Sequence, residues 1–206
     1  MLAVITLEHR PEGRPGIGQR RLGIERRKFW QNGIHCGLLA RALARIARHQ
    51  QCDRLFTVGL LYAIGKLAMA YQDPERMRRV QAQAVAGGVL ALSLEEQAFG
   101  FNYCHAGAAL LETWQFAASM WMPIACQRYP AAATDFRTDA AIINIAQAVT
   151  AALPPTADPS AIIVRNEVQI EPIAWLQCGL GADVLTAALS EVDLLWSPVS
   201  ETLVGN

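Results

Sequence analysis

Charged side chains are scarce in this chain of 206 residues: they make up 17% of the sequence, against 52% for hydrophobic residues. Basic and acidic residues number 18 each, so the formal net charge is zero. A protein without net charge has no overall field that would draw it to nucleic acid or to an acidic membrane. The apolar excess indicates that much of the chain is buried, either in a core or against a partner.

Paired cysteines, a secretion signal and a long apolar run are also missing. Residues 1–7 are apolar but too few, and lack the basic start, to form a signal peptide. No run approaches 18 apolar residues, which argues against a membrane span. The cysteines show no CxxC pair or other ligand spacing, so we expect a cytoplasmic protein with reduced, buried thiols. They are Cys36, Cys52, Cys104, Cys126 and Cys178.

Neither strand alternation nor an internal repeat is found. Apolar residues instead recur at steps of three and four, which predicts an all-α fold: a compact bundle of several helices. Segment 54–71 is apolar nearly all round, which predicts one central helix covered on every side. We expect helices at about 20–46, 54–71, 73–86, 93–100, 102–114, 117–127, 139–153 and within 175–195.

Short signals predict where some of these helices begin and end. Asp73 followed by Pro74 is typical of an N-cap and first turn, and Ser93 with Glu96 forms a capping-box pattern. Pro130 stops the helix before it. We expect three regions: a flexible segment 1–19, a helical domain 20–153, and a proline-rich loop with closing helices, 154–206, packed on the same domain.

Three segments carry a resemblance to a known family. They are FWQNGIHCGLLARALAR (29–45), GLLYAIGKL (59–67) and FGFNYCHAGAALLETW (99–114). Their order, spacing and apolar frame resemble the HDOD branch of the HD phosphohydrolase superfamily over roughly residues 29–152. In that family a histidine-bearing helix precedes a His-Asp pair before Ile-Gly-Lys-Leu, and a later Asp-His precedes Gly-Ala-x-Leu-Leu. The resemblance implies an HD-like helical fold.

The family's metal ligands are replaced at every matching position of this chain. The first histidine position is Asn32, the His-Asp pair is Tyr62 and Ala63, the later Asp-His is Asn102 and Tyr103, and the downstream histidines are Gln127 and Arg128. An alanine offers no ligand atom, and neutral amides are poor substitutes for imidazole or carboxylate around a transition metal. We therefore expect no metal, no cofactor and no catalytic residue at this site, where Tyr62, Tyr103, Asn32 and Gln127 would form a polar plug.

The resemblance also implies several helices before the Phe-Trp segment, whereas about 28 residues precede it here. The missing helices would be absent or supplied by another chain. We therefore expect the helices 29–46 and 54–71 to leave apolar surface for a protein partner or for self-association.

Two alternatives use residues that survive near the old site. His35 and His105, with Cys36 or Cys104, could form a rebuilt metal site, although no carboxylate accompanies them. Lys66 and Arg128 could bind a nucleotide-like anion without hydrolysing it. A hydrogen-bonded histidine and a lysine that reaches the surface are the simpler interpretations, and we favour them.

Other motifs carry no function. No G-x-S-x-G nucleophile turn is present, and the glycine-rich segment 13–18 lacks the lysine of a phosphate loop. The basic run Arg20, Arg21, Arg26, Arg27 and Lys28 has no DNA-reading motif beside it, so we expect no nucleic-acid partner. Our leading hypothesis is a non-catalytic, bacterial-type signalling module that acts through protein interaction. A diverged phosphohydrolase and an anion sensor are the alternatives.

Overall fold

The computed structural model describes residues 25–84, 89–153, 168 and 170–204. Every regular element in these residues is a helix, which confirms the all-α fold class. The elements are α1 (Arg26–Ile46), α2 (Cys52–Leu60), α3 (Ile64–Gln72), α4 (Pro74–Gln83), α5 (Val89–Phe99), α6 (Tyr103–Thr113), α7 (Ala118–Cys126), a 3-10 turn (Pro130–Ala132), α8 (Arg137–Ala152), α9 (Pro172–Cys178) and α10 (Val184–Val204). The expected segment 1–19 and most of the proline-rich loop lie outside the described residues.

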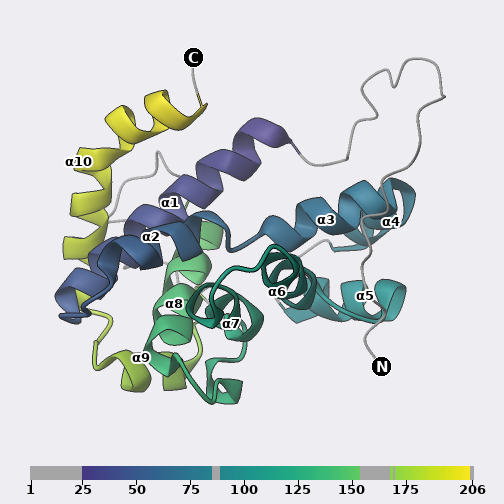
Figure 1. The fold of residues 1–206 in the computed structure, drawn as a ribbon. Coiled ribbons are helices and arrows are strands. Elements are labelled where there is room, and N and C mark those ends of the chain that lie inside the picture. Colours follow the sequence, from purple (N-terminus) through teal and green to yellow (C-terminus); the bar gives the residue numbers. More distant parts are fainter. Residues whose placement is uncertain (1–24, 85–88, 154–167, 169, 205–206) are drawn as a thin grey trace.

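The core forms around α1 and α8. Helix α1 packs against α2, α8 and α10, while α8 also contacts α7 and α9 (Figure 1). Every residue from Asp139 to Thr150 on α8 is buried. Burial on all sides, which the sequence pattern predicted for 54–71, is therefore found on α8, whose alanines and isoleucines let neighbouring helices approach from several directions.

Glycines allow the closest helix contacts. A Cβ atom on Gly37 of α1 would lie 2.7 Å from the carbonyl oxygen of Phe56 on α2, and one on Gly59 would lie 2.8 Å from that of Cys36. On the other side of the molecule, a Cβ on Gly65 of α3 would overlap the backbone of α6 at Tyr103. These backbones can lie against one another only because no side chain stands between them.

The expected single helix 54–71 is wrong: the chain turns at Leu61–Ala63, between α2 and α3. Leu61 and Ala63 leave helical geometry, with ψ of 2° and 11°. The turn frees the carbonyl of Tyr62, which accepts a hydrogen bond from the side chain of Gln127 at 2.8 Å. A side chain that bonds into the helical ladder in this way is a recognised cause of a kink.

The same stretch, Cys52–Gln72, is the one candidate membrane span among the described residues by length and composition. Half of its apolar window is buried inside the protein. A core helix of a soluble protein meets the same two criteria, so this candidate is weak evidence for a membrane span.

Two cap predictions have opposite outcomes. The side chain of Asp73 accepts a hydrogen bond from the backbone N–H of Arg76, which confirms it as the N-cap of α4. The capping box at Ser93 is wrong, because α5 begins earlier, at Val89, and Ser93 lies inside it. Leu92 of α5 packs with Met69, Met77 and Tyr103 in a second apolar cluster, and this burial favours a longer helix than the local signal predicted.

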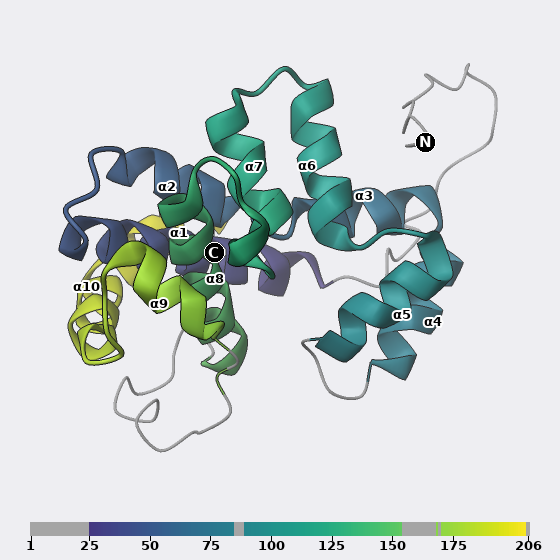
Figure 2. The ribbon, with the colours of Figure 1, turned by 90° about the horizontal axis from the view of Figure 1, so that it is seen from below.

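The helices α4 and α5 form a pair at one end of the molecule, beside α3 and α6 (Figure 2). At the opposite end α9 packs on α8, and α10 packs along α1. An ion pair of 2.8 Å joins Arg45 of α1 to Glu191 of α10. The two closing helices were expected, but α10 continues past the predicted end near Leu195 to Val204 and contains Pro198.

Candidate functional site

The positions that the family resemblance assigns to metal ligands lie on two helices, α1 and α6, and in two turns. Tyr62 and Ala63 occupy the turn between α2 and α3, and Asn32 lies on α1. Asn102 and Tyr103 begin α6, whereas Gln127 and Arg128 follow α7. All except Asn32 and Arg128 are buried.

Gln127 is the centre of the polar contacts at this position. Its side-chain amide donates to the carbonyls of Tyr62 (2.8 Å) and Ile124 (3.1 Å), and its own backbone carbonyl accepts from the side chain of Asn144 at 2.8 Å. The side chain is fully buried, and its Oε1 atom has no hydrogen-bond partner within the described residues. Gln127 therefore connects the α2–α3 turn, the end of α7 and α8.

Asn102 acts as a helix cap. Its Oδ1 atom accepts from the backbone N–H groups of Cys104 and His105, and its Nδ2 atom donates to Glu96 at 2.7 Å. Asparagine is among the best N-cap residues, because its side chain satisfies N–H groups that have no partner inside the helix. Both ends of this amide are thus occupied by protein groups.

Tyr62 and Tyr103 are buried between the helices. Buried rings are what the predicted polar plug requires. Tyr62 is 9% exposed and Tyr103 is 6% exposed. Burial raises the pKa of both phenols. Gln127 contacts Tyr62 at its backbone carbonyl, which accepts a hydrogen bond from the side-chain amide.

Lys66 lies over the ring of Tyr103, with its ammonium 4.5 Å from the ring centre. Burial lowers the pKa of Lys66; the carboxylate of Glu95 acts in the opposite direction and the charge of Arg128 adds to the lowering. Glu95 is itself buried and accepts the backbone N–H of Tyr103 at 2.8 Å. Arg128 donates to Gln147 of α8 at 3.1 Å. The structure thus places Lys66 and Arg128 within electrostatic reach of each other.

The two surviving histidines lie in different surroundings. His35 is buried, hydrogen-bonded through Nδ1 to Thr150 of α8 at 2.9 Å, and its ring meets that of Trp196 edge-on. Burial lowers the pKa of His35 to about 4. His105 is exposed on α6. Of the thiols beside them, Cys104 has a pKa raised by burial to about 12, which keeps it protonated.

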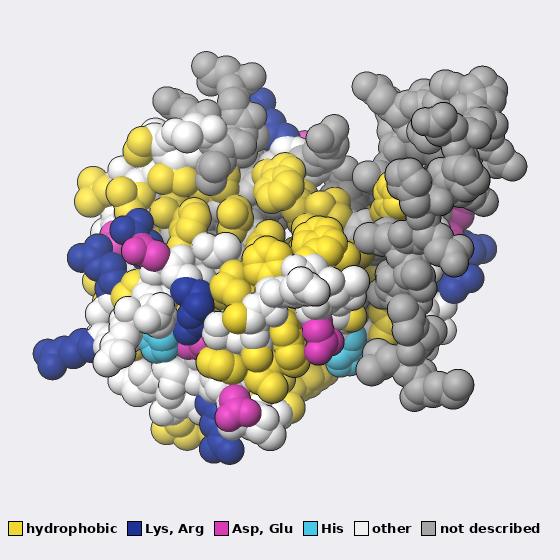
Figure 3. Space-filling view, viewed as in Figure 1, with side chains coloured by type: hydrophobic (Ala, Val, Ile, Leu, Met, Phe, Trp, Pro, Cys, Tyr) yellow, Lys and Arg dark blue, Asp and Glu magenta, His cyan; other side chains and the backbone are white. Residues whose placement is uncertain are grey.

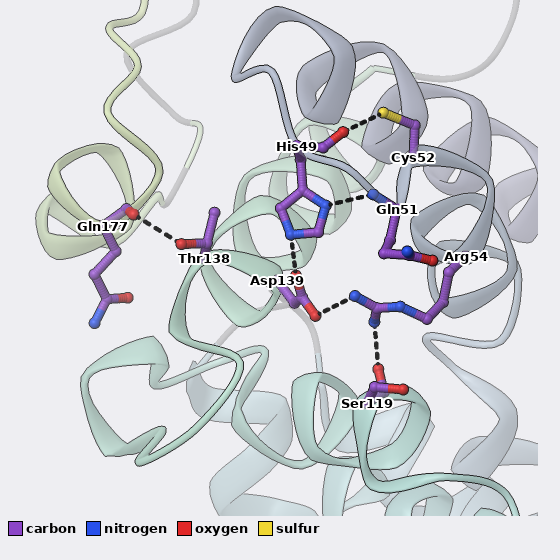
Figure 4. A network of polar contacts seen from close by, with 8 residues as sticks. All are labelled: His49, Gln51, Cys52, Arg54, Ser119, Thr138, Asp139 and Gln177. Carbon is purple, nitrogen blue, oxygen red and sulfur yellow. Dashed lines mark hydrogen bonds and ion pairs between the residues drawn. The ribbon is translucent and has the colours of Figure 1, made fainter.

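A buried charged network around Asp139 was not singled out by sequence reasoning. Asp139 of α8 is 3% exposed at its side chain; it forms an ion pair with Arg54 (2.8 Å) and lies 2.9 Å from Nε2 of His49 (Figure 4). Arg54 also donates to the carbonyl of Ser119 at 2.6 Å, and the ring nitrogen Nδ1 of His49 accepts from the backbone of Gln51. Because Nδ1 accepts a hydrogen bond, Nε2 carries the proton of the neutral imidazole and donates it to Asp139. No motif links these residues, because 85 positions separate Arg54 from Asp139.

The donor set at the ancestral site does not fit the metal of HD enzymes. Ala63 has no donor atom, and the oxygen of the Asn102 side chain already accepts two N–H groups. Among the described residues no group of three or more histidine, cysteine, aspartate or glutamate side chains is placed to hold a metal ion. Imidazole and carboxylate ligands are what such ions require.

The HDOD domain family matches residues 16–130, which is more than half of the sequence. The chain belongs to the HDOD family. The matched region runs from the undescribed N-terminal segment through α1–α7 to the start of the 3-10 turn, and so includes every ancestral metal position. No curated protein matches.

Solved structures share the HDOD fold at low sequence identity. A Shewanella amazonensis protein assigned as a phosphohydrolase has a TM-score of 0.68 at 20% identity, covering 88% of this chain and 65% of its own. An HDOD domain protein of unknown function from Geobacter sulfurreducens has a TM-score of 0.63 at 15% identity, covering 87% of this chain and 62% of its own. The MmoQ response regulator from Methylococcus capsulatus has a TM-score of 0.61 at 20% identity, covering 81% of this chain and 62% of its own. The chain thus spans less than two thirds of the length of these relatives.

Proposed function

We propose that this HDOD protein is a non-catalytic signalling module of the bacterial cytoplasm that acts by binding another protein or a second copy of itself. The observation that carries the proposal is the engagement of the ancestral metal positions in the fold. Gln127 holds the Tyr62 carbonyl, Asn102 caps α6, and the Tyr103 ring supports Lys66. Side chains that are needed for packing and capping are not free to bind a substrate or a metal.

Exposed apolar side chains support a role in protein interaction. Large hydrophobic residues stand out of the surface at Tyr71, Trp114, Leu176 and Leu194, the last with 80% of its surface exposed. Hydrophobic side chains also gather near the middle of the face in Figure 3. Helix α1 exposes less than expected, because α2, α8 and α10 cover it and leave mainly Trp30 and Ile46 at the surface. The MmoQ relative is a response regulator, which is compatible with a signalling role.

The test combines metal analysis, hydrolysis assays and sedimentation velocity on the purified protein. We expect no stoichiometric transition metal and no hydrolysis of phosphomonoester or phosphodiester substrates with added manganese, nickel or iron. We also expect concentration-dependent association. The exposed substitution Gln97→Ala serves as a preparation control. Turnover that is lost in both His35→Ala and His105→Ala, with each variant shown to be folded, would overturn the non-catalytic assignment.

A second candidate function is anion binding without hydrolysis, and the surroundings of Lys66 favour it. The ammonium of Lys66 makes no hydrogen bond or ion pair to the described residues and lies over the Tyr103 ring. Calorimetric titration with a nucleoside monophosphate distinguishes the two functions. Binding that Lys66→Met abolishes would favour the sensor, and the absence of heat at millimolar ligand would reject it.

A further inference from the structure

A hollow of about 270 Å³ lies between α4 and α5, away from the ancestral site. Arg76, Arg79, Val80 and Gln83 line it from α4, and Ala98 lines it from α5. On α4, Arg79 and Val80 lie three and four residues after Arg76, and Gln83 lies three and four residues after them, so the four form one face of that helix. The hollow is open to solvent, and the buried side chain of Val80 provides its apolar base.

Arg76 is held in place by three different groups. Its Nε atom pairs with Asp73 at 3.1 Å, one terminal nitrogen donates to the carbonyl of Ala98 at 3.3 Å, and the guanidinium lies 5.3 Å from the ring centre of Phe99. These contacts orient the planar group before any ligand arrives. The second terminal nitrogen, NH2, makes no hydrogen bond to the part of the chain that the structure describes.

Arg79 lies one turn further along α4. It is exposed and makes no hydrogen bond or ion pair within the described ranges, whereas its neighbour Arg78 pairs with Glu75. Residues three apart on a helix lie about 5–6 Å apart at their Cβ atoms. The hollow is therefore lined by one oriented guanidinium and by one that is unpaired among the described residues, with the amide of Gln83 as a further donor.

We propose that this hollow binds a glutamate or aspartate side chain from an acidic segment of a partner protein. Two guanidinium groups around an apolar base suit a carboxylate, which accepts paired N–H donors in one plane. A small molecule usually needs a pocket that encloses most of its surface, and an open hollow does not provide one, so a side chain presented by a polypeptide is the better occupant. This inference rests on the proposed interaction function and names the chemistry of one partner.

The experiment uses the full chain and a short labelled peptide of alternating glutamate and alanine, with a glutamine-for-glutamate version as the neutral probe. NMR follows the side-chain Nε–H signals of the arginines, and fluorescence anisotropy gives the affinity. We expect the glutamate peptide to shift the Arg79 signal saturably, and Arg79→Gln to weaken binding by about tenfold or more. The neutral peptide should not bind.

The matched control is Arg78→Gln, which removes the same charge one position away but outside the hollow. If Arg78→Gln and Arg79→Gln weaken binding equally, general electrostatic attraction explains the result and the hollow is not a site. Equal binding of both peptides, or binding of neither, also overturns the proposal. Saturable shifts that inorganic phosphate reproduces at the same concentration would assign the hollow to a small anion instead. Each of these failures leaves the interaction function intact if sedimentation still shows association through other surfaces.

Discussion

At the scale of single residues, the side chains at the positions that the family resemblance assigns to metal ligands stabilise the fold. Gln127 is the clearest example, because its amide satisfies the carbonyl that the α2–α3 turn releases. A buried carbonyl without a partner costs about 1–3 kcal/mol, so the turn and the glutamine depend on each other. The histidine at position 35 has a comparable role between α1 and α8, where it is neutral and buried.

We predict that Gln127→Leu lowers the free energy of unfolding by about 2 kcal/mol, since leucine fills the volume but leaves the Tyr62 carbonyl unpaired. Urea unfolding followed by circular dichroism measures the change. The control is Gln97→Leu, at an exposed position of α5, which should change stability by less than about 0.5 kcal/mol. Equal midpoints for the two variants would contradict the role given to Gln127.

We predict that His35 makes the protein less stable as the pH falls from about 6.5 to about 4. Its pKa is about 4 in the folded protein and 6.5 in the unfolded chain, so between these values only the unfolded chain binds the proton. The contribution of neutral His35 to the free energy of unfolding is fully present above pH 6.5 and declines by about 3 kcal/mol towards pH 4. Unfolding of the native protein and of His35→Gln over this range isolates the effect, and parallel pH profiles would contradict it.

At the scale of helices, close packing rather than helix propensity decides the arrangement. Glycine is an unfavourable helix residue, yet Gly37, Gly59 and Gly65 stand where α1 meets α2 and where α3 meets α6. The close approach of these backbones stabilises the fold by more than the low helix propensity of glycine destabilises it. The reason is that the approach allows the flanking apolar side chains to pack together.

We predict that Gly65→Ala destabilises the protein by about 3 kcal/mol, although alanine is the better helix former. The added methyl group would overlap the Tyr103 carbonyl on α6, so one of the two helices must move. Thermal unfolding compares it with Ser197→Ala, an exposed substitution on α10 that should be nearly neutral. A Gly65→Ala protein that is more stable than the native one would mean that α3 and α6 are not in close contact.

At the scale of the whole molecule, Asp139 joins parts of the chain that are distant in sequence. Its carboxylate binds His49 between α1 and α2 and Arg54 of α2, and Arg54 continues to the start of α7. Three non-glycine residues with positive φ lie close by in sequence: Arg48, Gln115 and Phe136. Strained backbone of this kind persists only where the surrounding structure holds it in place.

We predict that Asp139→Ala lowers the free energy of unfolding by about 3–5 kcal/mol, because it leaves Arg54 charged and partly buried without its partner. The exposed Asp193 on α10 is the matched control, and Asp193→Ala should have little effect. Chemical denaturation at neutral pH measures both variants. If the two lose similar amounts of stability, the network is peripheral to the fold.

The fold class and most helices were predictable from sequence, because apolar periodicity and caps such as Asp73 are local properties. The replacement of HD ligands was inferred from the resemblance alone, since it depends only on which residue occupies each position of the pattern, and it stays a prediction. The break at Leu61–Ala63 was not predictable, because it depends on a bond from Gln127, 65 positions away. The polar contacts of Asp139 and the hollow beside Arg79 were not predictable either. Side chains from separate helices meet there only after the chain has folded.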